Sequence, residues 1–400
     1  MKIKKLTDNF YWVGMLDPDL RIFDIVMETK FGTTYNSYIL IGKDKTVLFE
    51  ASKEKCFDEY IKKVEEITPI KDIDFIIANH TEPDHTGTIE KMLDMNKDLK
   101  ILGSMGAINF LKEITNKEIN GRAIKDGEKI DIGGLTIEFI VAPNLHWPDT
   151  IFSYIKEEGI LVSCDAFGSH YSDENITDDN LKSRTDYNEA LEYYFTNIMG
   201  PFKKDVLFAI EKIKNLDIKI LAPGHGPVVT THVKEVIEKY KELATDENKF
   251  TKKTVIIPYV TSYGYTKMLA EKIAEGIKSS ADIDVKLHDM VYDKFDDVMH
   301  EIYFADGFLL GTPTIAGEAL PNIWQIAISL NKHIHKGKLV SVFGSFGWSG
   351  EGVPNIIQRL KQVSLPIYKD EGLRVRFKPN KKQLEDAFAF GKGYAEELLK

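Results

Sequence analysis

A loop at residues 79–87 gathers four potential metal ligands. His80, Glu82, Asp84 and His85 lie within six residues of one another in the sequence. Imidazole and carboxylate groups together suit a first-row transition metal. Four ligands on one tight loop are more than one ion takes from one side. The loop therefore indicates two metal ions.

The segments around this loop predict how its ligands are positioned. The apolar run at residues 75–78 is typical of a buried β-strand, so the loop would begin at the strand's carboxyl end. Ligand sites in α/β proteins tend to lie at such ends. Three further potential ligands have the same setting, an apolar strand followed by a turn. They are His146 after residues 136–141, Asp165 after residues 159–163, and His225 after residues 220–222.

These strand ends would meet at one edge of a sheet, beside the first loop. A single histidine in such a loop is usually structural or solvent-exposed. Seven positions matching in order and context are not expected by chance. The remaining histidines have no such context and are expected at the surface: His232, His288, His300, His333 and His335.

The order His-x-Glu-x-Asp-His, then His, Asp and His, resembles the metallo-β-lactamase fold, and within it the flavodiiron branch. Hydrolases of this fold carry His-x-His-x-Asp-His and bind zinc, whereas Glu82 stands at the second position here. A harder, anionic oxygen donor shifts the preference toward iron. The resemblance implies one iron held by His80, Glu82 and His146, a second held by Asp84, His85 and His225, and Asp165 as the bridge.

The resemblance also implies a residue that acts on the substrate. His170 lies where the family places a pocket histidine, which would donate a proton or a hydrogen bond to bound oxygen. It is the predicted catalytic residue, although an ordinary loop histidine is an equal alternative. Tyr193, Tyr194 and Phe195 are further candidates for the pocket wall, and the sequence does not choose among them.

A second pattern starts near residue 249. A β-branched run at 254–260 precedes a turn rich in hydroxyl groups and then a predicted helix at 267–278. Backbone N–H groups and the dipole at the start of a helix favour phosphate. The turn has one glycine, which excludes a dinucleotide fingerprint and a P-loop.

Two later loops also follow apolar strands, and the three loops together resemble flavodoxin. The resemblance implies an FMN site, with Phe346 and Trp348 available to lie against the ring system. The implied FMN contacts are Thr261, Ser262, Tyr263, Gly264, Tyr265, Thr266, Thr312, Pro313, Thr314, Ile315, Ala316, Gly317, Ser345, Phe346, Gly347, Trp348, Ser349 and Gly350.

The two resemblances predict a chain of mixed α/β and α+β class. A metallo-β-lactamase-like αββα sandwich at residues 1–248, carrying the diiron site, would precede a flavodoxin-like doubly wound parallel sheet at 249–400. The length of 400 residues fits two large domains at ~150 residues or more each.

Composition excludes several classes of function. The net charge of −10 and the absence of a basic stripe argue against a nucleic-acid binder. No run approaches the ~18 apolar residues of a membrane span, and no signal-peptide pattern is present, so we expect a cytoplasmic protein. Cys56 and Cys164 form no Cys-x-x-Cys motif, so the chain has no rubredoxin-type iron site, and Cys164 is expected to be a buried core thiol.

Electron counting connects the two predicted cofactors. FMN carries two electrons and a diferrous pair two more, and four reduce dioxygen to two waters. Two electrons suffice to couple two NO molecules into N2O. The resemblance implies an enzyme that reduces O2, NO or both for detoxification, and the sequence does not separate these substrates.

Partners are also implied by the resemblance. It implies a head-to-tail homodimer or a dimer of such dimers, with FMN of one chain beside the diiron site of the other. The electron donor would be rubredoxin, with reduced coenzyme F420 as the alternative.

Two rival functions remain. One is a zinc-dependent hydrolase with an accessory flavodoxin domain, which Glu82 disfavours. The other is an electron carrier with a degenerate metal site, which the complete ligand set disfavours.

Overall fold

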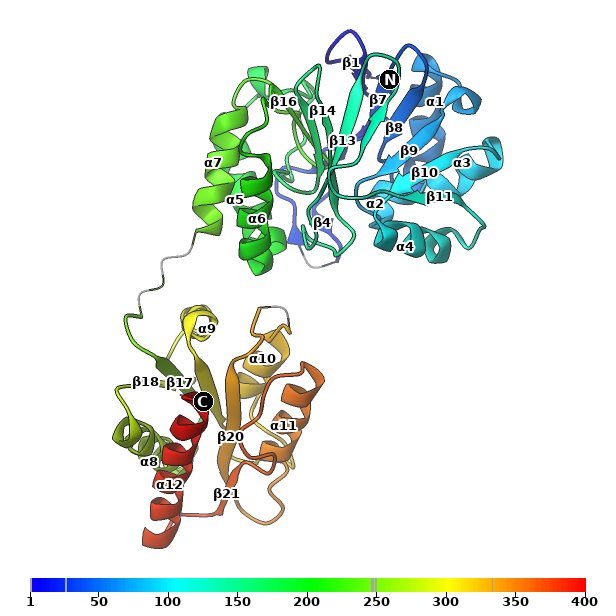
Figure 1. Cartoon of the computed structure of the whole chain (residues 1–400). Helices are drawn as coiled ribbons and strands as arrows, with labels where there is room; N and C mark the ends of the chain where they lie inside the picture. Colours follow the sequence, from blue (N-terminus) through cyan, green and yellow to red (C-terminus); the bar gives the residue numbers. More distant parts are fainter. Residues whose placement is uncertain (1, 26, 246–247, 249, 333) are drawn as a thin grey trace. The chain divides into compact units, whose positions relative to one another are not determined.

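The computed structural model describes residues 2–25, 27–245, 248, 250–332 and 334–400. The chain forms two compact units, Met1–Asp246 and Glu247–Lys400 (Figure 1). The domain division predicted from the sequence, 1–248 and 249–400, stays a proposal.

Of the histidines expected at the surface, His333 lies outside the described residues. His335 is buried, so the prediction for this residue was wrong.

Two sheets form the centre of the first unit. The larger has the strand order β1-β2-β7-β8-β9-β10-β11 and the smaller the order β12-β13-β14-β15-β16. The strands of the larger sheet are β1 (Lys4–Lys5), β2 (Phe10–Trp12), β7 (Tyr38–Ile41), β8 (Thr46–Phe49), β9 (Phe75–Ala78), β10 (Lys100–Gly103) and β11 (Asn120–Ala123). Those of the smaller are β12 (Lys129–Asp131), β13 (Thr136–Val141), β14 (Ile151–Ile155), β15 (Ile160–Cys164) and β16 (Ile220–Pro223).

Alternation of side chains along the strands explains why both faces of each sheet are covered. In β9, Ile77 packs into the core between the two sheets, while Ile76 packs against helices on the outside. The helices against the larger sheet are α1 (Phe57–Ile67), α3 (Ile89–Met95) and α4 (Met105–Thr115). Those against the smaller sheet are α5 (Arg184–Tyr194), α6 (Lys203–Ile213) and α7 (Val233–Ala244). Figure 1 shows these four layers, which confirms the αββα prediction.

Shorter elements lie at the sheet edge where the strands end. They are the pair β3 (Met15–Asp17) and β6 (Thr33–Tyr35), the hairpin β4 (Ile22–Phe23) and β5 (Met27–Glu28), and the one-turn helix α2 (Pro83–Thr86). A π-helical turn, Phe195–Met199, follows α5.

The second unit is a parallel sheet with the order β18-β17-β19-β20-β21. Its strands are β17 (Thr254–Tyr259), β18 (Asp284–Asp289), β19 (Gly307–Gly311), β20 (Leu339–Phe346) and β21 (Leu373–Arg376). Helices α8 (Tyr265–Ser280) and α12 (Lys381–Leu398) pack on one face, and α9 (Phe295–Phe304), α10 (Pro321–Ser329) and α11 (Gly352–Gln362) on the other. This is the predicted flavodoxin-like doubly wound sheet, whose topological switch point lies between β17 and β19.

No described helix combines the length and the apolar character needed to cross a bilayer.

Candidate metal centre

The loop after β9 is anchored at the edge where the strands of both sheets end. The backbone N–H of Ile151 donates to the carbonyl of Asn79 (2.8 Å), and the hydroxyl of Ser153 donates to the Asn79 side chain (2.7 Å). Pro83 then starts helix α2, because its fixed φ suits the first helical position. This single turn places Asp84 and His85 next to each other, with both side chains buried.

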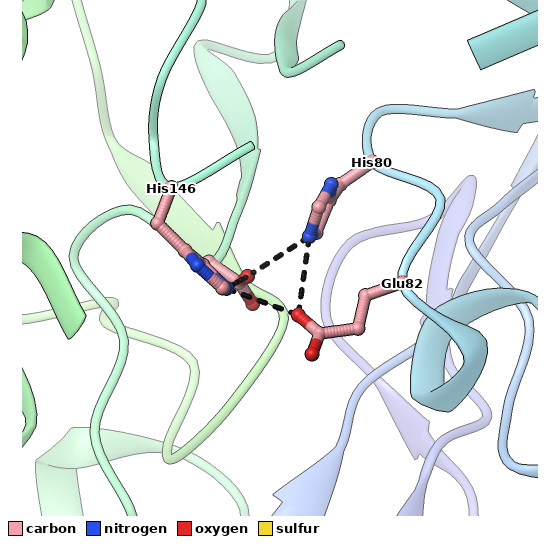
Figure 2. A group of neighbouring side chains, drawn as sticks. His80, Glu82 and His146 are labelled. Carbon is pink, nitrogen blue, oxygen red and sulfur yellow. Dashed lines mark hydrogen bonds and ion pairs between the residues drawn. The ribbon is translucent and has the colours of Figure 1, made fainter. Parts of the chain in front are cut away.

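The structure brings all seven predicted ligands together, in two neighbouring groups. The first consists of His80, Glu82, His146 and Asp165, and the second of Asp84, His85 and His225. In the first group, Oε2 of Glu82 lies 3.3 Å from Nε2 of His80 and 3.0 Å from Nε2 of His146. Figure 2 shows these three side chains directed toward one another.

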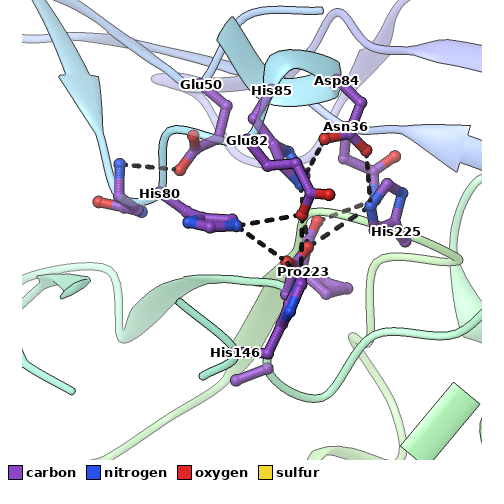
Figure 3. Close-up of polar contacts among 12 residues, drawn as sticks. Asn36, Glu50, His80, Glu82, Asp84, His85, His146, Pro223 and His225 are labelled. Carbon is purple, nitrogen blue, oxygen red and sulfur yellow. Dashed lines mark hydrogen bonds and ion pairs between the residues drawn. The ribbon is translucent and has the colours of Figure 1, made fainter. Parts of the chain in front are cut away.

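Asp165 lies between the two groups. Its Oδ2 is 3.4 Å from His80 Nε2 and 3.3 Å from His146 Nε2. Its Oδ1 is 2.9 Å from His85 Nε2 and 3.4 Å from His225 Nε2. One oxygen of Asp165 therefore faces each group, which is the arrangement of a bridging ligand. Figure 3 shows the labelled side chains of the two groups side by side: His80, Glu82 and His146 of the first, and Asp84, His85 and His225 of the second.

Asp84 provides the test of whether these residues fit metal ions. Its Oδ2 lies 3.1 Å from His225 Nε2, yet both of its oxygens are buried and accept no hydrogen bond from any described residue. Buried carboxylate oxygens normally have a partner. Ligand atoms bound at ~2.1 Å around an octahedral ion lie about 3 Å apart, close to the spacing seen here. The donor set fits two transition-metal ions.

The buried carboxylates control the protonation of the imidazoles. Burial disfavours a charged histidine, but hydrogen bonds to Asp149 and Glu82 outweigh it and raise the pKa of His80 to about 10. Hydrogen bonds to Asp165 and Glu82 raise the pKa of His146 to about 10 in the same way. A divalent cation would replace these protons as the partner of the carboxylates.

Contacts behind the ligands fix which ring nitrogen faces the centre. His80 Nδ1 lies 3.2 Å from Oδ1 of Asp149, which also accepts the hydroxyl of Thr81 at Oδ2 (2.7 Å). His225 Nδ1 lies 2.6 Å from the carbonyl oxygen of Thr34. Because these oxygens accept, Nδ1 carries the proton in both rings and Nε2 is left to bind metal.

A buried carboxyl group, that of Glu50 at the end of β8, is the neighbour of His85. The structure leaves His85 Nδ1 and Glu50 Oε2 buried, and neither has a hydrogen bond within the described parts of the chain. Ligand atoms of these two residues and of the buried Cys164 lie within 4.8 Å of one another. Sequence reasoning missed Glu50 and Asp149. Glu50 follows an apolar strand, so the rule that found the ligands would also have found it.

His170 is close to the centre but outside both ligand groups. Its ring contacts Phe23, Tyr194 and His225, with centroid distances of 4.4, 4.9 and 5.3 Å. Its Nδ1 lies 2.9 Å from the Thr33 hydroxyl, and its Nε2 is buried without a partner among the residues described. Burial lowers the pKa of His170 to about 3, so the ring is neutral near pH 7. Two of the aromatic candidates for the pocket wall lie in different places. Tyr194 contacts the His170 ring, whereas Phe195 packs against Tyr240.

The three predicted flavin loops all begin at carboxyl ends of strands on either side of the switch point. Thr266 Oγ1 lies 3.0 Å from Ser345 Oγ, and the backbone N–H of Thr314 donates to the carbonyl of Ser345 (3.1 Å). These bonds hold the three loops together. Gly264 has φ +80°, which places it as the cap of α8.

The first of these loops fits a phosphate group. The hydroxyl of Thr261 is buried and has no hydrogen-bond partner in the described ranges. An unpaired buried donor next to a helix start suits an anion. Trp348 is 83% exposed and Tyr263 is 83% exposed, so both rings are available to lie against a ligand. The eighteen proposed FMN contacts remain a proposal.

Each unit matches a known protein family model. A model described as ODP family beta lactamase matches residues 33–226, and one described as Flavodoxin matches residues 257–391. The chain is 37% identical over 399 residues to the flavo-diiron protein FprA2 of Clostridium acetobutylicum, covering 98% of this chain and 99% of that protein. It is 31% identical over 397 residues to a nitric oxide reductase of Moorella thermoacetica, covering 98% of each.

This chain is also similar to a solved structure over its whole length. The chain is similar to rubredoxin oxygen:oxidoreductase from the anaerobe Desulfovibrio gigas, with a TM-score of 0.63 and 25% identity. The similarity covers 100% of this chain and 99% of that one.

Proposed function

This chain belongs to the flavodiiron protein family, and we propose on that basis that it uses FMN and two iron ions to reduce dioxygen to water, nitric oxide to N2O, or both. It is an oxidoreductase, and removal of these gases is its role. The proposed iron ligands are the seven residues of the two groups, with Asp165 as the bridge.

One observation carries the proposal: each oxygen of Asp165 faces a different group of ligands, at 2.9 Å from His85 and 3.3 Å from His146. A cage of this kind holds two ions side by side. Glu82 replaces the imidazole of zinc hydrolases and contributes an anionic oxygen that favours iron. The hydrolase alternative is not favoured, because the relatives that cover the whole chain are flavo-diiron and nitric oxide-reducing proteins.

The cofactors and the protein have separate tasks. When bound, FMN supplies electrons singly or in pairs, and the iron pair supplies two more electrons and open coordination positions. The chain holds the imidazoles with Nε2 toward the centre through Asp149 and the Thr34 carbonyl. We propose that the neutral His170 lies beside the substrate and forms a hydrogen bond to it through Nε2.

The partners remain finer proposals. The name of the Desulfovibrio relative supports rubredoxin as the electron donor, and reduced coenzyme F420 is the alternative. We propose a head-to-tail homodimer or a pair of such dimers. Two free cysteines fit a reducing compartment, which supports our prediction of the cytoplasm.

Replacing Glu82 by histidine tests the assignment of iron. The variant should bind zinc in preference to iron and lose gas reduction, while FMN content stays unchanged because the flavin loops lie on the other unit. Metal content and absorbance of bound flavin are the measurements. Glu90→His is the matched control, since Glu90 lines the same cavity but belongs to neither ligand group.

Two results would contradict the proposal. A Glu82→His protein that keeps its iron and its turnover would remove the selectivity argument. A wild-type protein that is loaded with two irons and FMN, and that consumes neither O2 nor NO in anaerobic stopped-flow mixing, would remove the function. The same mixing experiment, run with each gas separately, ranks the two substrates.

A further inference from the structure

Two separate openings approach the ligand groups of the first unit. One is a wide cavity of about 860 Å³ with a charged lining that includes Asp24, Lys53, Glu82 and Asp84. The other is a small cavity of about 140 Å³ that has His170 in its lining. Its lining residues are Glu28, Thr29, Lys30, Phe31, His170, Glu189, Ala190 and Tyr193.

The inner part of the small cavity is buried. Thr29, His170 and Ala190 have exposed fractions of 1, 2 and 5%. Phe31, Ala190 and Tyr193 belong to its lining. The unpaired Nε2 of His170 is the one buried polar atom without a partner that the described residues of this lining contain.

A salt bridge joins two of the exposed residues of the lining. Lys30 Nζ lies 2.8 Å from Glu189 Oε1, with side chains 66 and 54% exposed. It links the segment after β5 to helix α5. Such an exposed pair contributes little to stability, so it opens readily.

We propose that this cavity, here called the side cavity, is a binding and entry site for a small apolar gas molecule on its way to the metal ligands. The inference rests on the proposed function, since O2 and NO are the molecules that must arrive. The volume is too small for a flavin or a peptide and is suited to a diatomic molecule. The lining also holds the exposed charged residues Glu28, Lys30 and Glu189, so a gas molecule would bind at the buried inner part, beside Ala190 and His170.

The position of His170 connects the side cavity to the ligands. His170 belongs to the cavity lining, and its ring also contacts His225, a proposed ligand of the second group, at a centroid distance of 5.3 Å. A molecule in the side cavity is thus one imidazole away from the second group. A small rotation of this ring, which Thr33 holds at Nδ1, would let the molecule pass.

The two openings would then have different tasks. The wide cavity has Glu82 and Asp84 in its wall and a charged rim, which suits an electron-delivering partner. Delivery of gas through the side cavity would leave that opening free for the partner. Substrate and electrons would reach the centre from different directions.

Xenon-pressurised crystals test the binding site without any reaction. The wild-type protein should show xenon bound among Phe31, His170, Ala190 and Tyr193. Ala190→Phe, which fills the cavity from helix α5, should abolish that peak. Absence of xenon from this cavity in the wild type would overturn the proposal.

Stopped-flow mixing of the reduced, iron- and FMN-loaded protein with O2 tests the route. The second-order rate constant should fall at least tenfold in Ala190→Phe. Asn188→Phe is the control, because Asn188 is on the same helix but lines a different cavity, and its rate should equal that of the wild type. Ala190→Val gives the same comparison with a smaller side chain should the phenylalanine variant fail to fold.

The outcomes separate the two proposals. An Ala190 variant that excludes xenon but reacts at the wild-type rate would refute the entry route and leave the enzyme's function intact. A loaded wild type that binds xenon but consumes neither gas would instead refute the proposed function.

Discussion

Replacing Asp149 by alanine should weaken iron binding although Asp149 is not one of the proposed ligands. Its Oδ1 lies 3.2 Å from Nδ1 of His80, and the side chains of both residues are fully buried. When a metal occupies Nε2, Nδ1 must carry a proton and needs an acceptor. The carboxylate supplies that acceptor, fixes the orientation of the ring and increases its basicity.

The expected loss follows from the contacts that disappear. Removing the partner of a ligating histidine costs about 10- to 100-fold in metal affinity, or about 1.4–2.8 kcal/mol. Asp149 also accepts the hydroxyl of Thr81 (2.7 Å), so the alanine variant leaves two buried donors without an acceptor. We therefore expect a loss near 100-fold for Asp149→Ala. Asp149→Asn keeps one acceptor oxygen and should lose about tenfold.

Anaerobic competition with a chelator of known affinity measures the effect as iron bound per chain. Asp178→Ala is the matched control. Asp178 is also a buried carboxylate paired with a histidine, at 2.8 Å from His232, and it accepts the backbone N–H of Thr231, but it contacts none of the proposed ligands. This control should lower the melting temperature and retain its iron affinity.

The comparison is decisive in both directions. If Asp149→Ala binds iron as tightly as the wild type, His80 does not depend on this acceptor and the reasoning fails. If Asp178→Ala loses iron to the same extent, the effect reports general destabilisation and not the orientation of one ring.

Four further outcomes follow from the same structure. Glu50→Gln should weaken iron at the second group by about tenfold, because Glu50 lies within 4.8 Å of a ring nitrogen of His85 and its buried Oε2 has no other partner among the described residues. Iron titration by absorbance would detect one weakened site of two. Iron uptake at pH 7 should release about three protons per chain, seen with an indicator dye, since the pKa of His80, His85 and His146 is raised to about 10 in the metal-free site; a release near zero would contradict this. In the metal-free protein, His170 should lower the free energy of unfolding as the pH falls below 6.5. The His170 ring binds a proton in the unfolded chain, whereas in the folded chain its pKa is about 3 and it stays neutral. Relative to His170→Phe, the wild type should lose about 2 kcal/mol between pH 7.5 and pH 5 when urea unfolding is compared, since His80, His85 and His146 titrate alike in both proteins. Thr261→Val should weaken FMN about tenfold or more in a fluorescence titration, because a charge-assisted hydrogen bond is worth about 1.5–3 kcal/mol; unchanged affinity would exclude a phosphate contact.

The sequence could predict that these seven residues come together because each of them follows a buried strand closely. Apolar runs such as residues 75–78 mark strands reliably, and the chain must turn at their carboxyl ends. The same logic predicted helix α8, which starts two residues earlier than expected, since Gly264 adopts φ +80° and caps it at Tyr265. Local patterns of this kind need no knowledge of distant contacts.

The surroundings of His170 could not be predicted in that way. Phe23 and Thr33 belong to very short strands that have no readable periodicity, and they meet His170 from positions more than a hundred residues away. Asp149 is a single acidic residue in a polar loop, and its role depends on the direction of the His80 ring. His335 was predicted to be exposed because it lacks an apolar pattern, yet it is buried and its Nδ1 lies 3.0 Å from the carbonyl oxygen of Asn331.

The charge balance of the centre explains how the fold can form before iron arrives. Glu82, Asp84 and Asp165 are three carboxylates in a mostly buried space, and buried charges need partners of opposite sign. Without metal, raised pKa values keep His80 and His146 protonated, so the imidazoles provide that positive charge. Iron then exchanges with protons inside a cage that already exists. Metal binding here should therefore add stability to a folded unit, unlike small zinc domains, in which the metal is required for folding itself.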